Sequence, residues 1–379
     1  MPSAALYVHV PFCLHKCPYC DFNAYSGLGR LIEPFVEALC REIAVYAGLY
    51  VPTISFGGGT PSLLSGAQLT EVLDSCRSCL DIAPDAEISL EANPGTLDLP
   101  LLEAYREAGV NRLSFGAQSF HKSELRWLGR DHTAQQTRDA VAMAREAGFT
   151  NLSLDLIFGL PGQRASQWEA SLQEALGLRT DHVSAYALTV EEGTPLGRRV
   201  ASGRMLAPDS DMQADMYERA EDLLDEAGFV HYEISNWARP GYESRHNMTY
   251  WRNEPYVGVG PGAHSYFEGR RFSTVRSPGE YIRRVARPHP LPLGEGIPAG
   301  APIAEIEVVD PKTDLFDTLT QGLRLIAGVD LATVRQRHGA FDKTVFHRLD
   351  GLVEQEGTVV RLTRRGRLLA NEVSLALMP

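Results

Sequence analysis

Short apolar runs alternate with amphipathic segments along the first 234 residues of this 379-residue chain. The apolar runs predict strands, which occupy residues 6–10, 53–56, 87–91, 112–115, 151–156 and 182–187. The segments between them have helical periodicity, and several end in a glycine that suits a helix C-cap, as at Gly109, Gly148 and Gly228. Repeated strand–helix units predict a parallel sheet covered by helices. We therefore expect an α/β fold whose strands form a barrel or part of one.

The last third of the chain predicts a smaller, separate domain. A Pro/Gly-rich stretch at residues 288–302 is typical of a linker. Three helical patterns, a hairpin-like segment and a last helical run follow at residues 314–326, 331–338, 343–356, 358–362 and 364–377. Helices followed by a short strand pair indicate a winged-helix-like α+β domain. The predicted divisions are the barrel, an extension that ends in the linker, and the C-terminal domain, at residues 1–235, 236–303 and 304–379.

Three cysteines stand within eight residues directly after the first predicted strand, namely Cys13, Cys17 and Cys20. A cubane iron–sulfur cluster is normally held by four thiolates, so three would leave one iron without a protein ligand. An open metal position belongs to catalytic rather than structural sites, by the logic established for zinc. Pro11 and Pro18 disfavour a helix here, so we expect a loop. On spacing alone, a zinc site completed by His15 or His9 is the alternative.

Polar residues or glycines follow the carboxyl ends of several predicted strands. A Gly-Gly-Gly-Thr-Pro sequence at residues 57–61 follows the second strand, where glycines permit close approach to the backbone. Glu91 ends the third strand, Gln118 follows the fourth, Arg130 comes after it, and Asp155 lies in the fifth. Because parallel strands place their carboxyl ends at one edge, these side chains are expected to converge there. A carboxylate suits an amine, and a guanidinium suits a carboxylate.

Taken together, these motifs resemble those of the radical S-adenosylmethionine (SAM) enzymes. The resemblance rests on the cysteine loop, the glycine-rich turn, Glu91-Ala92-Asn93-Pro94 and the Asp-Leu-Ile-Phe-Gly-Leu-Pro-Gly run at Asp155, and it covers nearly the whole chain. It points to the branch that contains oxygen-independent coproporphyrinogen III oxidase and the heme chaperone HemW. It implies a partial barrel that carries a [4Fe–4S] cluster on the three cysteines, with SAM on the fourth iron.

The resemblance also implies the SAM-contact positions. These are Tyr7, Tyr19, Gly58, Gly59, Thr60, Glu91, Gln118, Arg130, Asp155 and Ala187. Among them, we expect Glu91 to pair with the methionyl ammonium, Arg130 with the methionyl carboxylate, and Asp155 with a ribose hydroxyl.

Two features discriminate between the oxidase and the chaperone within this branch. The oxidase pattern has a further cysteine two places after the third, where this chain has Phe22. A His-Asn-x-x-Tyr-Trp run that begins at His246 resembles the HemW signature. It predicts His246 as a heme iron ligand and Tyr250 and Trp251 as rings that pack on a porphyrin. His264 is a second candidate ligand. Outside this context, a histidine in an aromatic cluster would more often be a core residue.

The resemblance implies a heme chaperone that binds heme and passes it to apo-hemoprotein acceptors, in a membrane or outside it, with an electron donor to the cluster. The alternatives are an oxygen-independent coproporphyrinogen III dehydrogenase of heme biosynthesis and a zinc-stabilised binding protein. No residue is assigned a catalytic role. The net charge of −12 argues against nucleic-acid binding. Without an apolar run of about 18 residues or a signal peptide, we expect a cytoplasmic protein that is not integral to a membrane.

Overall fold

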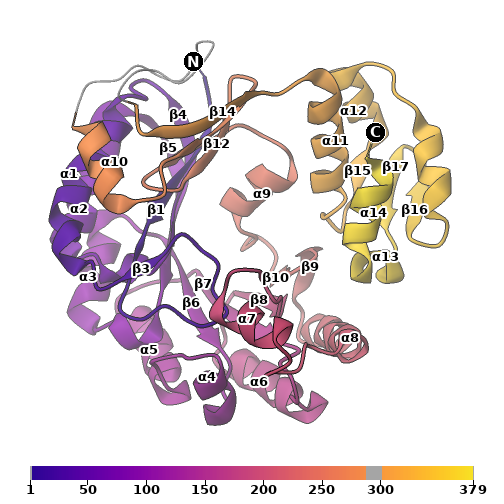
Figure 1. Cartoon of the computed structure of the whole chain (residues 1–379), viewed down its shortest axis with the longest axis horizontal. Helices are drawn as coiled ribbons and strands as arrows, with labels where there is room; N and C mark the ends of the chain where they lie inside the picture. The colour runs from indigo at the N-terminus through magenta and orange to yellow at the C-terminus, as the bar shows by residue number, and fades with distance from the viewer. Residues whose placement is uncertain (1, 287–300, 379) are drawn as a thin grey trace.

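The computed structural model, which describes residues 2–286 and 301–378, contains a large sheet with helices packed around it (Figure 1). Six neighbouring parallel strands form its centre: β1 (Ala5–Val10), β4 (Tyr50–Gly58), β5 (Asp81–Ala92), β6 (Arg112–Gln118), β7 (Leu152–Phe158) and β8 (His182–Ala187). Each of them overlaps a strand that the sequence predicts. The main helices are α1 (Ile32–Ala44), α2 (Gly66–Cys79), α3 (Leu99–Ala108), α5 (Ala134–Glu146), α6 (Ala165–Gly177) and α8 (Ser210–Glu226).

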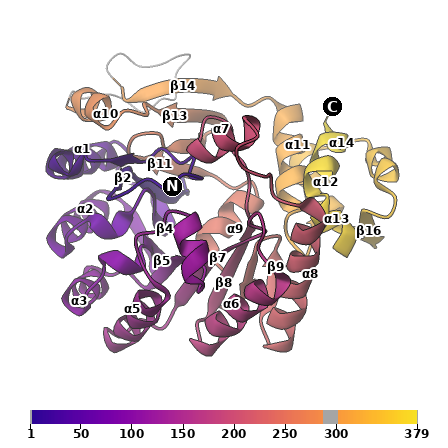
Figure 2. The same cartoon turned by 60° about the horizontal axis from the view of Figure 1, so that its bottom comes forward.

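Further strands extend the sheet on both sides. Next to β1 lie β11 (Tyr256–Val259), β12 (His264–Phe267), β13 (Arg270–Thr274) and β14 (Ile303–Val308), and next to β8 lie β10 (Asn236–Ala238) and β9 (Val230–Glu233). Along the described chain the sheet stays open between β14 and β9, so the barrel is partial and the predicted fold class is confirmed. Figure 2 shows α1, α2, α3, α5 and α6 as an outer layer beside the strands, whereas α9 (Arg245–Trp251) lies on the inner side of the sheet.

Helix ends carry the residues that stabilise them. Ser65 forms a capping box with Gln68 at the start of α2, and Asp98 accepts a hydrogen bond from Leu101 at the start of α3. Gly109 ends α3 with φ of +107°, a left-handed conformation that the predicted C-cap requires. These local signals set where each helix begins and ends.

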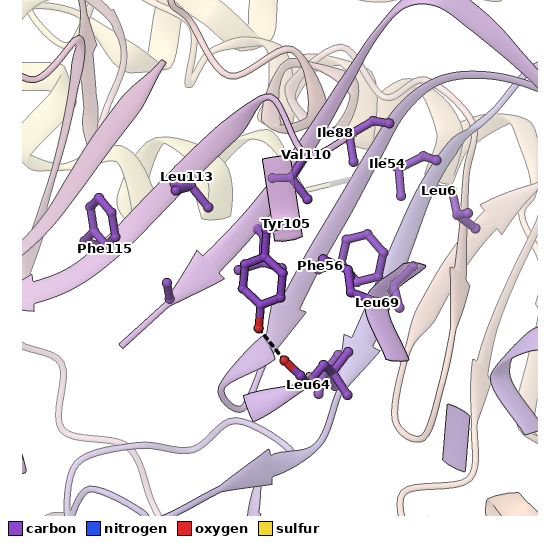
Figure 3. Packing of buried hydrophobic residues seen from close by; sticks show 14 of the residues in the cluster. Leu6, Ile54, Phe56, Leu64, Leu69, Ile88, Tyr105, Val110, Leu113 and Phe115 are labelled. Carbon is purple, nitrogen blue, oxygen red and sulfur yellow. Dashed lines mark hydrogen bonds between the residues drawn. The ribbon is translucent and has the colours of Figure 1, made fainter. Parts of the chain in front are cut away.

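Apolar side chains of the central strands and their helices form the main hydrophobic core (Figure 3). Members from the first four central strands include Leu6, Ile54, Phe56, Ile88, Leu113 and Phe115. Fully burying one such side chain stabilises the fold by about 1.5–3 kcal/mol. Tyr105 of α3 lies in the same core, where its hydroxyl donates a hydrogen bond to the Leu64 carbonyl.

A second hydrophobic core belongs to the C-terminal part of the chain. It is built from α11 (Pro311–Gly322), α12 (Leu331–His338), α14 (Ala370–Leu377) and a small sheet of β15 (Val329–Asp330), β17 (Val359–Leu362) and β16 (Val353–Glu356). The large sheet extends past residue 304, the predicted start of this domain, because β14 pairs with β13. Residues 288–300 of the predicted linker lie outside the described residues.

The prediction of one helix in this domain, at residues 343–356, is wrong. The helical pattern at residues 343–356 forms a 3-10 helix, η4 (Lys343–Leu349), followed by the strand β16. Gly351 adopts φ of +73°, which ends helical geometry at that point. The strand β16 then pairs with β17, so contacts made in the folded chain outweigh the helical periodicity of the segment.

The buried bond between Tyr105 and Leu64 gives a test of the main core. We expect Tyr105→Phe to lower the free energy of unfolding by about 1–2 kcal/mol, because the buried Leu64 carbonyl loses its donor. Urea unfolding followed by circular dichroism measures this change. Tyr50→Phe is the matched control, since Tyr50 is 37% exposed; equal effects of the two substitutions would contradict the interpretation.

Candidate functional site

The three cysteines lie on the loop that follows β1. Cys13 belongs to a short strand, β2 (Phe12–Cys13), which pairs with β3 (Tyr25–Ser26), and the other two cysteines lie between these strands. The segment between β2 and β3 forms turns and bends, in agreement with the loop that Pro11 and Pro18 predict. All three thiols line one cavity of about 390 Å³ at the carboxyl ends of the central strands.

Glycines at the end of β4 let that strand pack directly on the cysteine loop. The Gly59 N–H donates to the Val10 carbonyl at 2.8 Å, and the Thr60 N–H donates to the Phe12 carbonyl at 2.8 Å. A Cβ atom on Gly59 would lie 2.6 Å from the Phe12 carbonyl oxygen, so no larger residue fits. The sequence predicts that another group lies close to the backbone of these glycines. In the structure, that group is the backbone of the cysteine loop.

The thiols lie in a partly buried setting. The Thr60 hydroxyl donates to Cys13 Sγ at 3.4 Å. Burial raises the pKa of the Cys13 and Cys20 thiols, which disfavours free thiolates. A metal cluster would oppose this effect, because a coordinated thiol is deprotonated by the charge of the metal.

Arg130 connects the cysteine loop with the end of β6. Its Nη1 donates to Cys17 Sγ at 3.5 Å, and its Nη2 donates to the Gly116 carbonyl at 3.0 Å. Its buried Nε has no hydrogen-bond partner among the described residues. Buried polar atoms normally have partners, and a bound carboxylate would provide one for a guanidinium.

Two carboxyl groups, Glu91 of β5 and Asp155 of β7, line the same cavity. Glu91 accepts a hydrogen bond from the Gly58 N–H at 3.3 Å, and burial together with Asp155 raises the pKa of Glu91 to about 7. The Ser114 hydroxyl donates to Asp155 and lies 3.0 Å from both carboxylate oxygens. Burial also raises the pKa of Asp155. A cationic ligand would favour the ionised form of both groups.

The other residues expected to contact SAM divide between this cavity and its neighbour. The cysteine cavity is lined by Tyr19, Gly58, Gly59, Thr60, Gln118 and Ala187. Gln118 has φ of +62°, which is unusual outside glycine and typical of functional sites. Tyr7 instead lines a larger cavity, with its hydroxyl 3.1 Å from His9 Nδ1.

This larger cavity, of about 820 Å³, adjoins the first, since Phe22, Gly58 and Glu91 line both. His264, which is exposed at the start of β12, lies on its wall. Asp317 of α11 also lines it, so the cavity lies between the large sheet and the C-terminal part of the chain. Its aromatic lining includes Tyr7, Phe22, Tyr250, Trp251, Tyr256 and Tyr266.

The structure separates the residues of the His-Asn-x-x-Tyr-Trp run. They form α9 (Arg245–Trp251), on which Tyr250 and Trp251 line the larger cavity. His246 is 2% exposed and is not among the described residues that line this cavity. Its Nδ1 lies 2.9 Å from Thr53 Oγ1 and its Nε2 lies 2.8 Å from the Tyr250 hydroxyl. Burial lowers the pKa of His246 to about 3, so the ring is neutral and hydrogen-bonded at both nitrogens.

Several cavity residues had not been assigned to the site from sequence. Asn93 follows Glu91 at the end of β5, and its Nδ2 donates to Asp131 Oδ1 at 2.9 Å; the strand-end pattern could have identified it. Tyr256 and Tyr266 reach the larger cavity because β11 and β12 pair beside β1. No sequence motif predicts that β11 and β12 pair beside β1.

Comparison with known proteins agrees with this geometry. Residues 7–175 match the Radical SAM superfamily, and residues 309–369 match the HemN C-terminal domain. The heme chaperone HemW of Bacillus subtilis (strain 168) is 38% identical over 378 residues, which cover 97% of this chain and 97% of that protein. This chain belongs to the HemW family of radical SAM proteins. The heme chaperone HemW of a Synechocystis species is 42% identical over 340 residues, covering 88% of this chain and 80% of that protein.

The fold that this HemW family member adopts is also found in a solved structure. The coproporphyrinogen III oxidase HemN from Escherichia coli, a radical SAM enzyme, superposes with a TM-score of 0.84. The match covers 99% of this chain and 90% of that one, at 24% identity. The likeness therefore establishes the shared partial barrel and C-terminal domain.

Membership of the radical SAM superfamily implies a [4Fe–4S] cluster and SAM, and the residues of the smaller cavity fit both. Within the described residues, no three His, Cys, Asp or Glu side chains converge as ligands of one metal ion. A cubane does not require such convergence, because each thiolate binds a different iron. The thiols, the carboxyl groups of Glu91 and Asp155, and the unpaired Arg130 Nε offer partners for irons, an ammonium and a carboxylate. Membership of the HemW family thus favours the cluster over the zinc alternative.

The raised pKa of Glu91 predicts that the affinity for SAM depends on pH, because Glu91 is the expected partner of the SAM ammonium. Below pH 7 the free Glu91 is largely protonated, so binding an ammonium must first remove a proton. We expect the Kd of the cluster-loaded protein for SAM to rise about tenfold between pH 7.5 and pH 6. Equilibrium dialysis with radiolabelled SAM measures it.

Glu91→Gln should weaken SAM binding at pH 7.5 and abolish its pH dependence over the same range. Glu103→Gln, on the exposed side of α3, is the control and should behave as the native protein does. A native slope retained in Glu91→Gln would show that another group titrates.

Proposed function

We propose that this chain is a heme chaperone, which binds heme and transfers it to acceptor proteins while carrying a [4Fe–4S] cluster and SAM on a radical SAM scaffold. Two HemW relatives named as heme chaperones are 38% and 42% identical over most of the chain. The observation that carries the proposal is the second cavity, of about 820 Å³, directly beside the cysteine cavity. Its volume lies within the range of small-molecule and cofactor sites.

The lining of this cavity suits a porphyrin. Tyr250 and Trp251 come from α9, and Tyr256 and Tyr266 come from the neighbouring strands β11 and β12. Aromatic rings of this kind bury large apolar area and stack on flat π systems. The HemW-like run on α9 therefore contributes rings to the proposed heme site.

His264 is the iron ligand that the geometry favours. It lies on the cavity wall and is exposed, so its imidazole is open to a ligand. His246, the other candidate, would have to give up a hydrogen bond to Thr53 or to Tyr250 before it could bind iron. We assign His246 the role of holding α9 and the hydroxyl of Tyr250 in place.

In the smaller cavity we assign Cys13, Cys17 and Cys20 to the cluster. Glu91 would pair with the ammonium of SAM, Arg130 with its carboxylate and Asp155 with a ribose hydroxyl, as the residue chemistry favours. When bound, the cluster would supply one-electron redox chemistry and an iron that the three thiolates leave without a protein ligand. The residues of the chain orient SAM and keep this centre partly buried.

The alternative, coproporphyrinogen III dehydrogenase, has less support. The oxidase pattern has a cysteine where this chain has Phe22, whose side chain is 60% exposed and lines both cavities. An apolar ring at this position cannot reproduce a thiol. We therefore keep the chaperone as the proposal.

We propose apo-hemoproteins as acceptors, in a membrane or outside it, and a separate electron donor to the cluster. In the described residues, no helix is both long and apolar enough to cross a bilayer. A cytoplasmic location suits a loop of three unpaired cysteines, because cytosolic reductants keep thiols reduced.

Heme titration tests the assignment of His264. We expect the native protein to give a Soret band on addition of heme and His264→Ala to bind heme at least tenfold more weakly, because the iron loses its ligand. His15→Ala is the matched control, since His15 is exposed and lines the other cavity. Equal losses in both variants would indicate adventitious binding by surface histidines.

Turnover of coproporphyrinogen III separates the chaperone from the dehydrogenase. With cluster, SAM and a strong reductant, the native protein should form no protoporphyrinogen IX, while the HemN enzyme from Escherichia coli serves as positive control under the same conditions. Product formed at a rate comparable to that control would overturn the chaperone proposal.

A further inference from the structure

We propose that Arg276 forms a carboxylate-binding subsite at the rim of the larger cavity and takes a propionate group of the bound heme; this inference rests on the proposed function. Arg276 follows β13 and lines the cavity together with His264. Its side chain is exposed, so its guanidinium is accessible to a ligand. Guanidinium groups bind carboxylates through two parallel hydrogen bonds.

The backbone of Arg276 is held in place by the cysteine loop. Asn23 Nδ2 donates to the Arg276 carbonyl at 2.9 Å, and the Tyr25 hydroxyl donates to the same carbonyl at 3.2 Å. Arg276 Nε donates in turn to Asn23 Oδ1 at 3.4 Å. A guanidinium that starts from a fixed position loses less conformational freedom when it binds.

The same contacts place Arg276 beside the proposed iron ligand. Asn23 Nδ2 also donates to the Pro261 carbonyl at 2.8 Å, and the Gly262 N–H donates to the Val275 carbonyl at 3.0 Å. His264 pairs with Ser273 across the β12–β13 hairpin. The imidazole and the guanidinium thus come from adjoining segments of one wall. Heme presents a central iron and two carboxylates on one edge, so this wall would supply a partner for the iron and a partner for one carboxylate.

The positive charge of Arg276 is available to bind an anionic group of a ligand. Among the residues that the structure describes, no carboxylate forms an ion pair with it, whereas Arg271, which lines the same cavity, pairs with Asp317. Glu305 of β14 also lines the cavity and adds a negative charge there. The cavity as a whole is therefore not strongly cationic. Because Arg271 is already paired, we assign the recognition of a carboxylate to Arg276.

Heme and heme dimethyl ester, which has no free carboxylate, distinguish this subsite from the rest of the heme site. We expect Arg276→Gln to weaken binding of heme about fivefold, the size typical of an exposed charge pair. It should leave the Kd for the dimethyl ester unchanged. Raising the salt concentration should reduce the difference between native protein and variant, because the contact is solvent-exposed.

Arg283→Gln is the matched control. Arg283 is exposed on α10 (Pro278–Val285), where its Nε donates to the Gly279 carbonyl, and it should affect neither ligand. A parallel titration with SAM identifies the source of the carboxylate, since SAM carries one as well. Arg276→Gln should leave the Kd for SAM unchanged.

Each outcome has one meaning. If the native protein binds neither heme nor its ester, the proposed function fails. If heme binds but Arg276→Gln weakens heme and ester equally, or weakens neither, the function stands and the subsite is overturned. A loss of SAM affinity without a loss of heme affinity would assign Arg276 to SAM and also overturn the inference. Urea unfolding of the variant checks that its fold is retained.

Discussion

The backbone contact between the end of β4 and the cysteine loop is the interaction on which the site depends. Two short hydrogen bonds join Gly59 and Thr60 to Val10 and Phe12, and the glycine allows an approach that any Cβ atom would prevent. This contact holds the loop over the carboxyl ends of the parallel strands. The three thiols therefore face the strand-end residues across one cavity. Without these hydrogen bonds, the loop would lose the contact that joins it directly to the neighbouring strand β4.

The smaller cavity contains groups that the protein alone does not fully satisfy. Glu91 and Asp155 both line this cavity, and desolvation by the surrounding protein raises the pKa of each carboxyl group. Arg130 has a buried Nε without a partner in the described chain. A ligand with matching charges would offset the cost of desolvating these ionisable groups, which meets the requirement of the site. An ammonium and a carboxylate on one molecule meet this requirement, and SAM carries both.

The two cavities share walls, and this links their chemistry. Glu91 and Gly58 line both, so a ligand in one lies close to a ligand in the other. Asn23 extends the connection, because it joins the end of the cysteine loop to the hairpin that carries His264. A change in the cysteine loop would thus reach the proposed heme site through one side chain. Such a short path suits a chaperone in which cofactor and cargo influence each other.

The sequence by itself determined the features that depend on local pattern. Periodic apolar residues predicted the central strands, and cysteine spacing with prolines predicted a ligand-binding loop after β1. Strand-end residues such as Glu91 and Asp155 could be placed together because parallel strands share an edge. The resemblance to radical SAM proteins named further contacts, and the cavity contains all of them except Tyr7.

Tertiary structure alone decided the rest, because those features depend on contacts between distant segments. His246 had been a candidate ligand, yet Thr53 and Tyr250 occupy both its ring nitrogens in the core. The segment at residues 343–356 had helical periodicity, but pairing with β17 made its end a strand. Arg276 and Tyr266 became cavity residues only through the pairing of β11 with β1 and of β12 with β11. The periodicity of the sequence indicates which face of a helix or strand is apolar. The residues that pack against that face depend on how strands distant in sequence pair with one another.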